Sequence, residues 1–249
     1  MILRRLGRSI REQDWFAVSL ELAVVVVGIF LGLQVTDWNE TRKARAGERL
    51  YLERLHAELG VATGELAQRF DNLTERMEQS SAALVALNAG DLGDLAAQEF
   101  GYALMVVQRN ETIDSGITTI EELISTGNLA RIRDPGLRAR IAGSYLSNES
   151  LRRYIEMIAE RMAGVLPVLH TRYQPRIRGT PFEEVRFDFD ALASDAAFIN
   201  AYAAALMYLG TNRWWVATAH DDLEALRAEV GEALGRETVA PVRLLDDSP

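Results

Sequence analysis

The hydrophobic residues of this sequence form an almost continuous run near its start, over residues 16–36, with polar residues on both sides. About 20 residues of α-helix rise about 30 Å, the thickness of the hydrocarbon core of a membrane. Trp15 and Trp38 lie at the two ends, where tryptophan rings favour the headgroup layer. The pattern predicts a transmembrane anchor helix at 16–36 behind a short cytoplasmic segment at 1–15, with Trp15 and Trp38 as membrane-boundary aromatics.

A cleavable signal peptide is the alternative interpretation of this run. Its apolar core would span about 7–15 residues and end at two small residues separated by one position. The run here is longer, and the residues that follow it, QVTDWNE, contain no such site. The sequence therefore favours an anchor that is not cleaved.

Four residues within the anchor share one face of the helix. Steps of three and four residues align Glu21, Val25, Gly28 and Gly32. Small residues allow a second helix to approach closely, and a carboxyl group in lipid needs a partner or a proton. The pattern indicates a helix–helix interface, either within a homo-oligomer or with another membrane protein. The alternative is that Glu21 reaches the headgroup layer and that the glycines have no such role.

Behind the anchor, apolar residues recur at alternating spacings of three and four, which is typical of a helix that buries one face. The recurring positions are Leu52, Leu55, Leu59, Ala62, Leu66, Leu73, Met77, Leu84 and Leu87, with Arg69 and Ser80 in the two gaps. The pattern predicts one long, heptad-patterned helix over 37–90. The gaps and the nearby Phe70 favour packing in a bundle over a pure coiled-coil dimer.

The rest of the chain predicts a helical-bundle domain over 91–235. Helices are expected at about 95–109 and 117–125, and Asp134 with Pro135 marks the start of another that runs toward His170. Pro167 is expected to kink or end that helix.

A final helix is expected from about Ser194 to Leu234. The insert at 174–190 lacks helical periodicity, and its alternating residues 185–189 favour a strand or an extended loop. A loose tail follows at 236–249. The predicted fold class is all-α: one transmembrane helix, a long helix and a bundle with one short extended insert.

Two segments resemble a known family. The first carries the signature Trp38, Asn39, Glu40 and Arg42, followed by Glu48, Leu52 and Leu55; the second matches at Leu123, Gly127, Asn128, Leu129 and Leu137. Both are similar to the DUF6090-type bacterial membrane proteins of unknown function. The segments cover about a quarter of the chain and do not include its C-terminal half. The resemblance implies a single-pass protein of the bacterial inner membrane with its soluble domain outside the cytoplasm, and it implies no activity.

The charge of the chain argues against one class of partner. The formal net charge is -9, and residues 1–38 contribute nothing to it because four arginines there balance four carboxylates. The acidic excess therefore lies on the soluble part, which argues against nucleic acid as a partner. The chain has no cysteine, which excludes disulfides and thiolate metal sites. Lys43 is the only lysine, and this, with abundant alanine, indicates a bacterial chain.

No arrangement of residues points to catalysis, a cofactor or a metal. His56, His170 and His220 lie far apart in the sequence, and consecutive residues such as His220–Asp222 cannot all reach one ion from a helix. Two clusters are candidate ligand sites. The insert region carries Arg172, Arg176, Arg178 and Arg186, for which salt bridges to Glu183, Glu184 and Asp188 are the simpler interpretation. Trp214 and Trp215 lie near Tyr202, Tyr208 and Arg213, where core packing is the simpler interpretation.

These patterns predict a membrane-anchored, non-enzymatic interaction or assembly protein that acts through its anchor and long helix. The alternative is an extracytoplasmic helical-bundle sensor that binds a small ligand and signals through a partner protein. The expected partners are the membrane and either a second copy of the chain or another membrane protein. The sequence does not decide whether the chain also binds a small-molecule ligand.

Overall fold

The computed structural model describes residues 15–109, 117–178, 180–237 and 240–244, and it describes the backbone alone at 15–19, 21, 175–178 and 180–184. The chain divides into two units, Met1–Leu50 and Tyr51–Pro249. Regular structure in the described residues is helical apart from one two-stranded hairpin. The predicted all-α class with one short extended insert is therefore confirmed.

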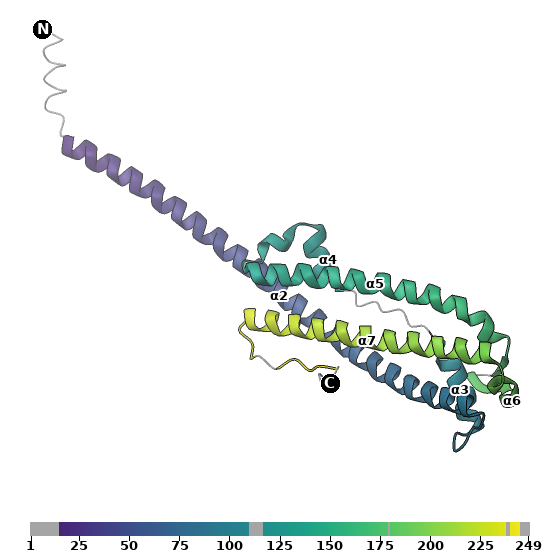
Figure 1. Cartoon of the computed structure of the whole chain (residues 1–249). Coiled ribbons are helices and arrows are strands. Elements are labelled where there is room, and N and C mark those ends of the chain that lie inside the picture. Colours follow the sequence, from purple (N-terminus) through teal and green to yellow (C-terminus); the bar gives the residue numbers. More distant parts are fainter. Residues whose placement is uncertain (1–14, 110–116, 179, 238–239, 245–249) are drawn as a thin grey trace, which may run out of the picture. The chain divides into compact units, whose positions relative to one another are not determined.

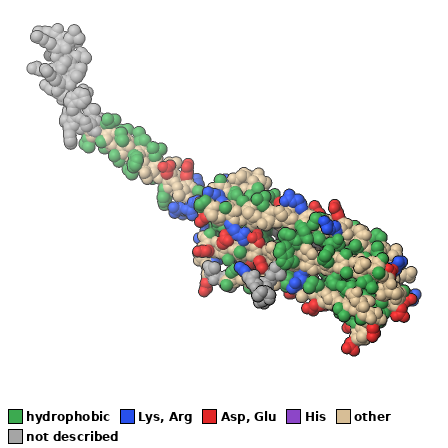
Figure 2. Space-filling model, in the orientation of Figure 1, with side chains coloured by type: hydrophobic (Ala, Val, Ile, Leu, Met, Phe, Trp, Pro, Cys, Tyr) green, Lys and Arg blue, Asp and Glu red, His purple; other side chains and the backbone are tan. Residues whose placement is uncertain are grey.

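The first unit consists of the N-terminal part of helix α2, whose full bounds are Trp15–Ala89. Its large apolar side chains between residues 20 and 38 are all exposed (Figure 2). An 18-residue window here has a mean hydropathy of 1.6 and no buried residue. By length and composition this stretch can cross a membrane, as the sequence predicts. The predicted cytoplasmic segment lies outside the described residues, except for Trp15 at the start of α2.

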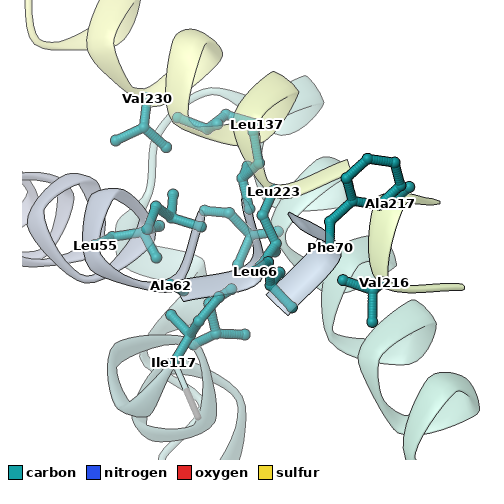
Figure 3. Packing of buried hydrophobic residues seen from close by; sticks show 14 of the residues in the cluster. Leu55, Ala62, Leu66, Phe70, Ile117, Leu137, Val216, Ala217, Leu223 and Val230 are labelled. Carbon is teal, nitrogen blue, oxygen red and sulfur yellow. The ribbon is translucent and has the colours of Figure 1, made fainter. Parts of the chain in front are cut away.

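The second unit is built on three long helices: α2 from Tyr51 onward, α5 (Pro135–His170) and α7 (Ala196–Ala233), which lie side by side (Figure 1). Their apolar side chains form one core cluster with Ile117 and Ile120 (Figure 3). The cluster takes Leu52, Leu55, Leu59, Ala62, Leu66 and Leu73 from the stripe on α2. The stripe that the sequence predicts is thus buried within the same chain.

The second half of the stripe differs from the prediction. Leu73, Ser80 and Leu87 are buried as expected, but Phe70, Arg76 and Ala83 take the buried positions expected for Arg69, Met77 and Leu84, which are only partly buried. An α-helix has 3.6 residues per turn, so a strict seven-residue repeat drifts around a straight helix. The neighbours of α2 in the bundle, and not the repeat alone, decide which side faces inward.

Capping residues account for where the other two long helices begin. The carboxylate of Asp134 accepts a hydrogen bond from Leu137 N at 2.9 Å and caps α5. Asp195 caps α7 in the same way, accepting from Ala197 N at 3.0 Å and Phe198 N at 3.2 Å. Unsatisfied N–H groups at a helix start favour these capping residues. The helix runs to His170 as expected, so of the two effects expected of Pro167, a kink or an end, the end is wrong.

A second core cluster lies around α3 (Ala97–Val106), the hairpin and α6 (Phe189–Ala193). The hairpin pairs β1 (Tyr173–Arg178) with β2 (Thr180–Phe187) in antiparallel register, so the extended insert is a pair of strands. The ring of Phe100 lies 5.0 Å from that of Phe187 and 5.2 Å from that of Phe189. Gly101 permits this approach, because a Cβ there would lie 3.2 Å from Val185 Cβ and from a Phe187 ring carbon.

A short connection closes the other end of the bundle. It contains α4 (Thr118–Ser125) and the 3₁₀ turn η1 (Asn128–Arg131). Glu58 on α2 fixes the start of α4: its carboxylate accepts from Thr119 N at 2.8 Å and from the hydroxyl of Thr118 at 2.9 Å. Part of the tail is also attached, since Leu244 N donates to Asp221 Oδ1 at 3.0 Å and its side chain packs on the core.

Candidate binding groove

A groove of about 400 Å³ lies between α5 and α7 in the second unit. Its lining comes from Ser144, Leu146, Ser147, Asn148, Ser150 and Leu151 on α5 and from Trp215, Thr218, Ala219, Asp222 and Leu223 on α7. Three serines and an alanine leave this space unfilled, because their side chains are too small to close the gap between two helices. Figure 2 shows hydrophobic side chains gathered on the α5–α7 part of the bundle surface.

A hydrogen-bonded network closes one end of the groove. Arg140 Nη1 donates to Asp222 Oδ1 at 2.7 Å, and Arg140 Nε donates to Glu229 Oε1 at 3.1 Å. The buried hydroxyl of Ser144 donates to the other oxygen of Asp222 at 3.1 Å. Asp222 is thus held by two donors. The network ties the start of α5 to the end of α7 and keeps the carboxylate in place at the groove.

Trp215 lines the groove and packs against two further aromatic rings. The ring of Trp215 lies 4.7 Å from that of Tyr154 and 4.9 Å from that of Trp214, with an edge-on arrangement in the second pair. Trp214 is 49% exposed. Trp214 is not among the residues that line the groove, whereas Trp215 is. The structure therefore places Trp215 in a groove, where the simpler interpretation had expected core packing.

The other members of the predicted aromatic cluster lie elsewhere. Tyr202 is fully buried in the second core cluster, and its hydroxyl donates to Ala103 O at 3.2 Å. The guanidinium of Arg213 lies 4.3 Å from the centre of the Phe70 ring and donates to Thr74 Oγ1 at 2.7 Å. For these two residues the expectation of structural packing holds.

The predicted anchor face lies on the exposed part of α2. Val25 is 54% exposed, and a Cβ added at Gly28 or Gly32 would meet no atom within 4 Å. The hydroxyl of Thr36 donates to Gly32 O at 3.0 Å. The side chains of Glu21 and Trp15 lie outside the described part of the chain, so their predicted roles stay predictions. The Trp38 ring lies 5.9 Å from the Arg42 guanidinium.

The second family-like segment shapes the connection before α5. Gly127 has a left-handed backbone with φ of 71°, which a glycine adopts without strain and which ends α4 as predicted. The amide of Asn128 donates to the hydroxyl of Tyr51 at 3.2 Å, and that hydroxyl donates to Glu122 Oε1 at 3.1 Å. Leu129 packs on the core. These residues stabilise the fold and do not line the groove.

The three histidines remain separate. Arg236 Nη1 donates to His56 Nδ1 at 2.8 Å; burial and then the charges of Arg236 and Arg227 lower the pKa of His56 below its usual range. His220 is buried, with Nδ1 3.0 Å from Asp221 Oδ1. Among the residues that the structure describes, no group of three or more His, Cys, Asp or Glu side chains could hold a metal ion.

His170 lies in a small polar cluster with Gln108 and Tyr173. Its Nε2 is 2.6 Å from Gln108 Oε1, and Gln108 also hydrogen-bonds the hydroxyl of Tyr173. That hydroxyl donates to Leu104 O at 3.2 Å, and burial raises the pKa of Tyr173 to about 12. A phenol held protonated in this way serves as a hydrogen-bond donor and not as a base.

Of the four arginines predicted to cluster at the insert, the structure describes the side chains of Arg172 and Arg186. Arg172 Nε donates to Asp195 Oδ2 at 2.6 Å, which lowers the pKa of that carboxyl; Asp195 was not among the partners expected from the sequence. Asp188 caps α6 by accepting from Ala191 N at 3.1 Å. Arg186 is exposed. The side chains of Arg176, Arg178, Glu183 and Glu184 lie outside the described part of the chain.

Sequence patterns alone did not reveal the groove. Its signal is the spacing of Ser144, Ser147 and Ser150 on α5, but serines in a helix usually mark a solvent-facing side. The described structure thus defines a helical bundle with a groove and a candidate membrane span. Comparisons of the chain with protein-family models, with curated proteins and with solved structures found no match. The resemblance to the DUF6090-type family stays a prediction.

Proposed function

We propose that this chain is a non-enzymatic, membrane-anchored binding protein whose helical bundle holds a small molecule in the α5–α7 groove. The observation that carries this proposal is the groove itself, an apolar hollow of about 400 Å³ with Trp215 in its wall and a polar network at one end. Small-molecule sites are typically concave, mostly apolar and supplied with a few fixed polar groups. The groove has all three features.

The burial of the α2 stripe also supports binding in the groove over assembly through the long helix. Leu55, Leu59 and Leu66 are already packed against the same chain. On the described part of α2 after residue 50, the large apolar side chains that remain exposed are Val61 and Val85, which are too far apart to form a seam. The sensor hypothesis therefore gains support from the geometry, and a partner protein would transmit the signal.

Binding in the groove is testable with probes of the right size. In the full chain, reconstituted in lipid nanodiscs, we expect 2-phenylethanol to bind, as measured by ligand-detected NMR titration. Ser147→Leu places a larger side chain in the groove from its exposed edge, and we expect it to weaken binding at least about tenfold. Ala163→Leu, at another exposed position of α5, is the matched control and should bind as the original chain does.

The same comparison can contradict the proposal. Partition of the probe into the nanodisc lipid is the same for both variants and therefore cancels between them. If Ser147→Leu and Ala163→Leu give the same signal as the original chain, the probe does not occupy the groove. The proposed function would then fail.

Association through the anchor is the second candidate function, and the open face at Val25, Gly28 and Gly32 favours it. Glycines spaced by four residues let two helices in lipid pack closely. We expect the double substitution Gly28→Leu and Gly32→Leu to weaken self-association at least about tenfold, measured by sedimentation in detergent. Ala23→Leu, on the opposite face, should leave association unchanged. Identical behaviour of both variants and the original chain would rule out this interface.

We place the anchor in the bacterial inner membrane and the bundle outside the cytoplasm. This orientation rests on the resemblance to the DUF6090-type family, because Arg4, Arg5, Arg8 and Arg11 before the span are matched by Arg42, Lys43, Arg45 and Arg49 after it. A reporter that is active only in the cytoplasm, fused after Pro249, should be silent. An active reporter would reverse the orientation.

A further inference from the structure

The size of the groove favours a small molecule over a helix from another protein. Its volume of about 400 Å³ lies near the lower end of the range of about 300–1,000 Å³ found for small-molecule sites. A stable protein interface instead buries about 800 Å² on each partner. Leu146, Leu151, Trp215 and Leu223 supply most of the apolar lining. The body of the ligand must therefore be apolar.

The hydroxyl groups of the lining limit the polar end of the ligand. A hydroxyl has one proton to donate and two lone pairs that can accept. Ser144 donates its proton to Asp222 Oδ2 at 3.1 Å, and Thr218 donates to Trp214 O at 2.9 Å. Ser150 donates to Leu146 O at 2.9 Å and also accepts from Arg153 at 3.3 Å. With these three protons already used, the oxygens of Ser144, Ser150 and Thr218 offer acceptors to a ligand. The other polar side chains of the lining besides Asp222 are those of Ser147 and Asn148.

The charge of the lining also favours a ligand that donates hydrogen bonds. Asp222 is the one ionisable residue among the groove-lining residues that the structure describes. Arg140 donates to it but is shared with Glu229, so the network holds one positive and two negative side chains. A carboxylate ligand would meet a negative group and acceptor oxygens at this end of the groove. An alcohol or an amine would meet acceptors for each proton that it donates.

We infer that the groove selects an apolar molecule whose polar end donates hydrogen bonds, an alcohol or an amine, and discriminates against carboxylates. This inference rests on the proposed function, since it specifies the ligand of the same groove. The discrimination arises where Ser144 and Asp222 line the groove: a carboxylate placed against these acceptors loses its water and gains no partner from them.

Three probes of nearly equal size test the inference in the full chain in lipid nanodiscs. 2-Phenylethanol and phenethylamine carry donor ends, and phenylacetate carries a carboxylate on the same ring. We expect both donor probes to bind at least about tenfold more tightly than phenylacetate, measured by ligand-detected NMR titration. The signal that remains in the groove-filling variant Ser147→Leu is subtracted as binding outside the groove. Thr218→Val removes one acceptor oxygen at nearly constant volume and should reduce this preference several-fold.

The outcomes separate the two proposals. If phenylacetate binds as tightly as the donor probes and Ser147→Leu abolishes its binding, the groove is a ligand site but the inference on its chemistry is wrong. If Thr218→Val leaves a tenfold preference unchanged, the preference does not come from that hydroxyl, and the mechanism inferred here is wrong. If no probe responds to Ser147→Leu, the proposed function fails as well.

Discussion

Replacing Phe100 by alanine is expected to lower the free energy of unfolding of the bundle by about 3–5 kcal/mol, the usual loss for a large buried aromatic ring. Phe100 is 0% exposed. Its ring contacts those of Phe187 on β2 and Phe189 on α6. Removal of the ring leaves a cavity between α3 and the hairpin, and the two remaining rings lose their common partner. The hairpin is too small to be stable without this packing.

Urea unfolding of the full chain in lipid nanodiscs, followed by the fluorescence of Trp214 and Trp215, measures this loss. Tyr102→Ala on the same helix is the control, because Tyr102 is 43% exposed and its loss should change the stability by less than about 1 kcal/mol. Amide exchange in β1 and β2 should accelerate in Phe100→Ala before the rest of the bundle opens. Equal stability of Phe100→Ala and Tyr102→Ala would contradict the packing described for α3.

The elements that the sequence predicts correctly are those whose signals are local. The carboxylate of Asp134 followed by Pro135 marks the start of α5, and Gly127 marks the end of α4, because caps satisfy backbone groups within a few residues. The spacing of leucines from Leu52 to Leu66 identifies the buried face of α2, because this spacing also repeats within one or two turns. In each case the deciding residues lie within one or two turns of the feature that they determine.

Features that depend on distant contacts were not predictable. The bare spacing of the serines on α5 does not show that Ala219 and Thr218 lie opposite them. That pairing requires the register between α5 and α7, which the Arg140–Asp222 contact fixes across 82 residues of sequence.

In the anchor the sequence pattern is clear, but the interface that it predicts would form with a second helix. Val25, Gly28 and Gly32 present an open face, and nothing within the same chain covers it in the described residues. A stripe of small residues can pack against a second helix, or it can face lipid alone. Its role as an interface therefore stays a prediction that only the association measurement can decide.

Replacing Arg76 by methionine is expected to lower the free energy of unfolding by about 3 kcal/mol, even though methionine suits the apolar pattern of α2 better than arginine does. Arg76 is 6% exposed and lies on the core-facing side of α2. Its Nε and Nη2 donate to Val106 O at 3.2 and 2.8 Å, and Nη2 also donates to Arg109 O.

The physical reason lies at the C-terminal end of α3. The last carbonyl groups of a helix have no partner within it, and a positive charge beside them is favourable. No basic residue occurs in the last turn of α3, so the guanidinium on α2 supplies the donors. Val106 O also accepts from Arg109 N at 3.2 Å. Methionine would fill the volume but remove the charged donors from Val106 O and Arg109 O, and that loss exceeds the gain from burying a more apolar side chain.

Two further variants distinguish this mechanism from a simple change of volume. Arg76→Lys keeps the charge but loses the forked donors, so its stability should lie between those of the original chain and Arg76→Met. Glu78→Met alters an exposed position of the same helix and should shift the stability by less than about 0.5 kcal/mol. An Arg76→Met chain as stable as the original would show that the carbonyl groups of α3 find other donors.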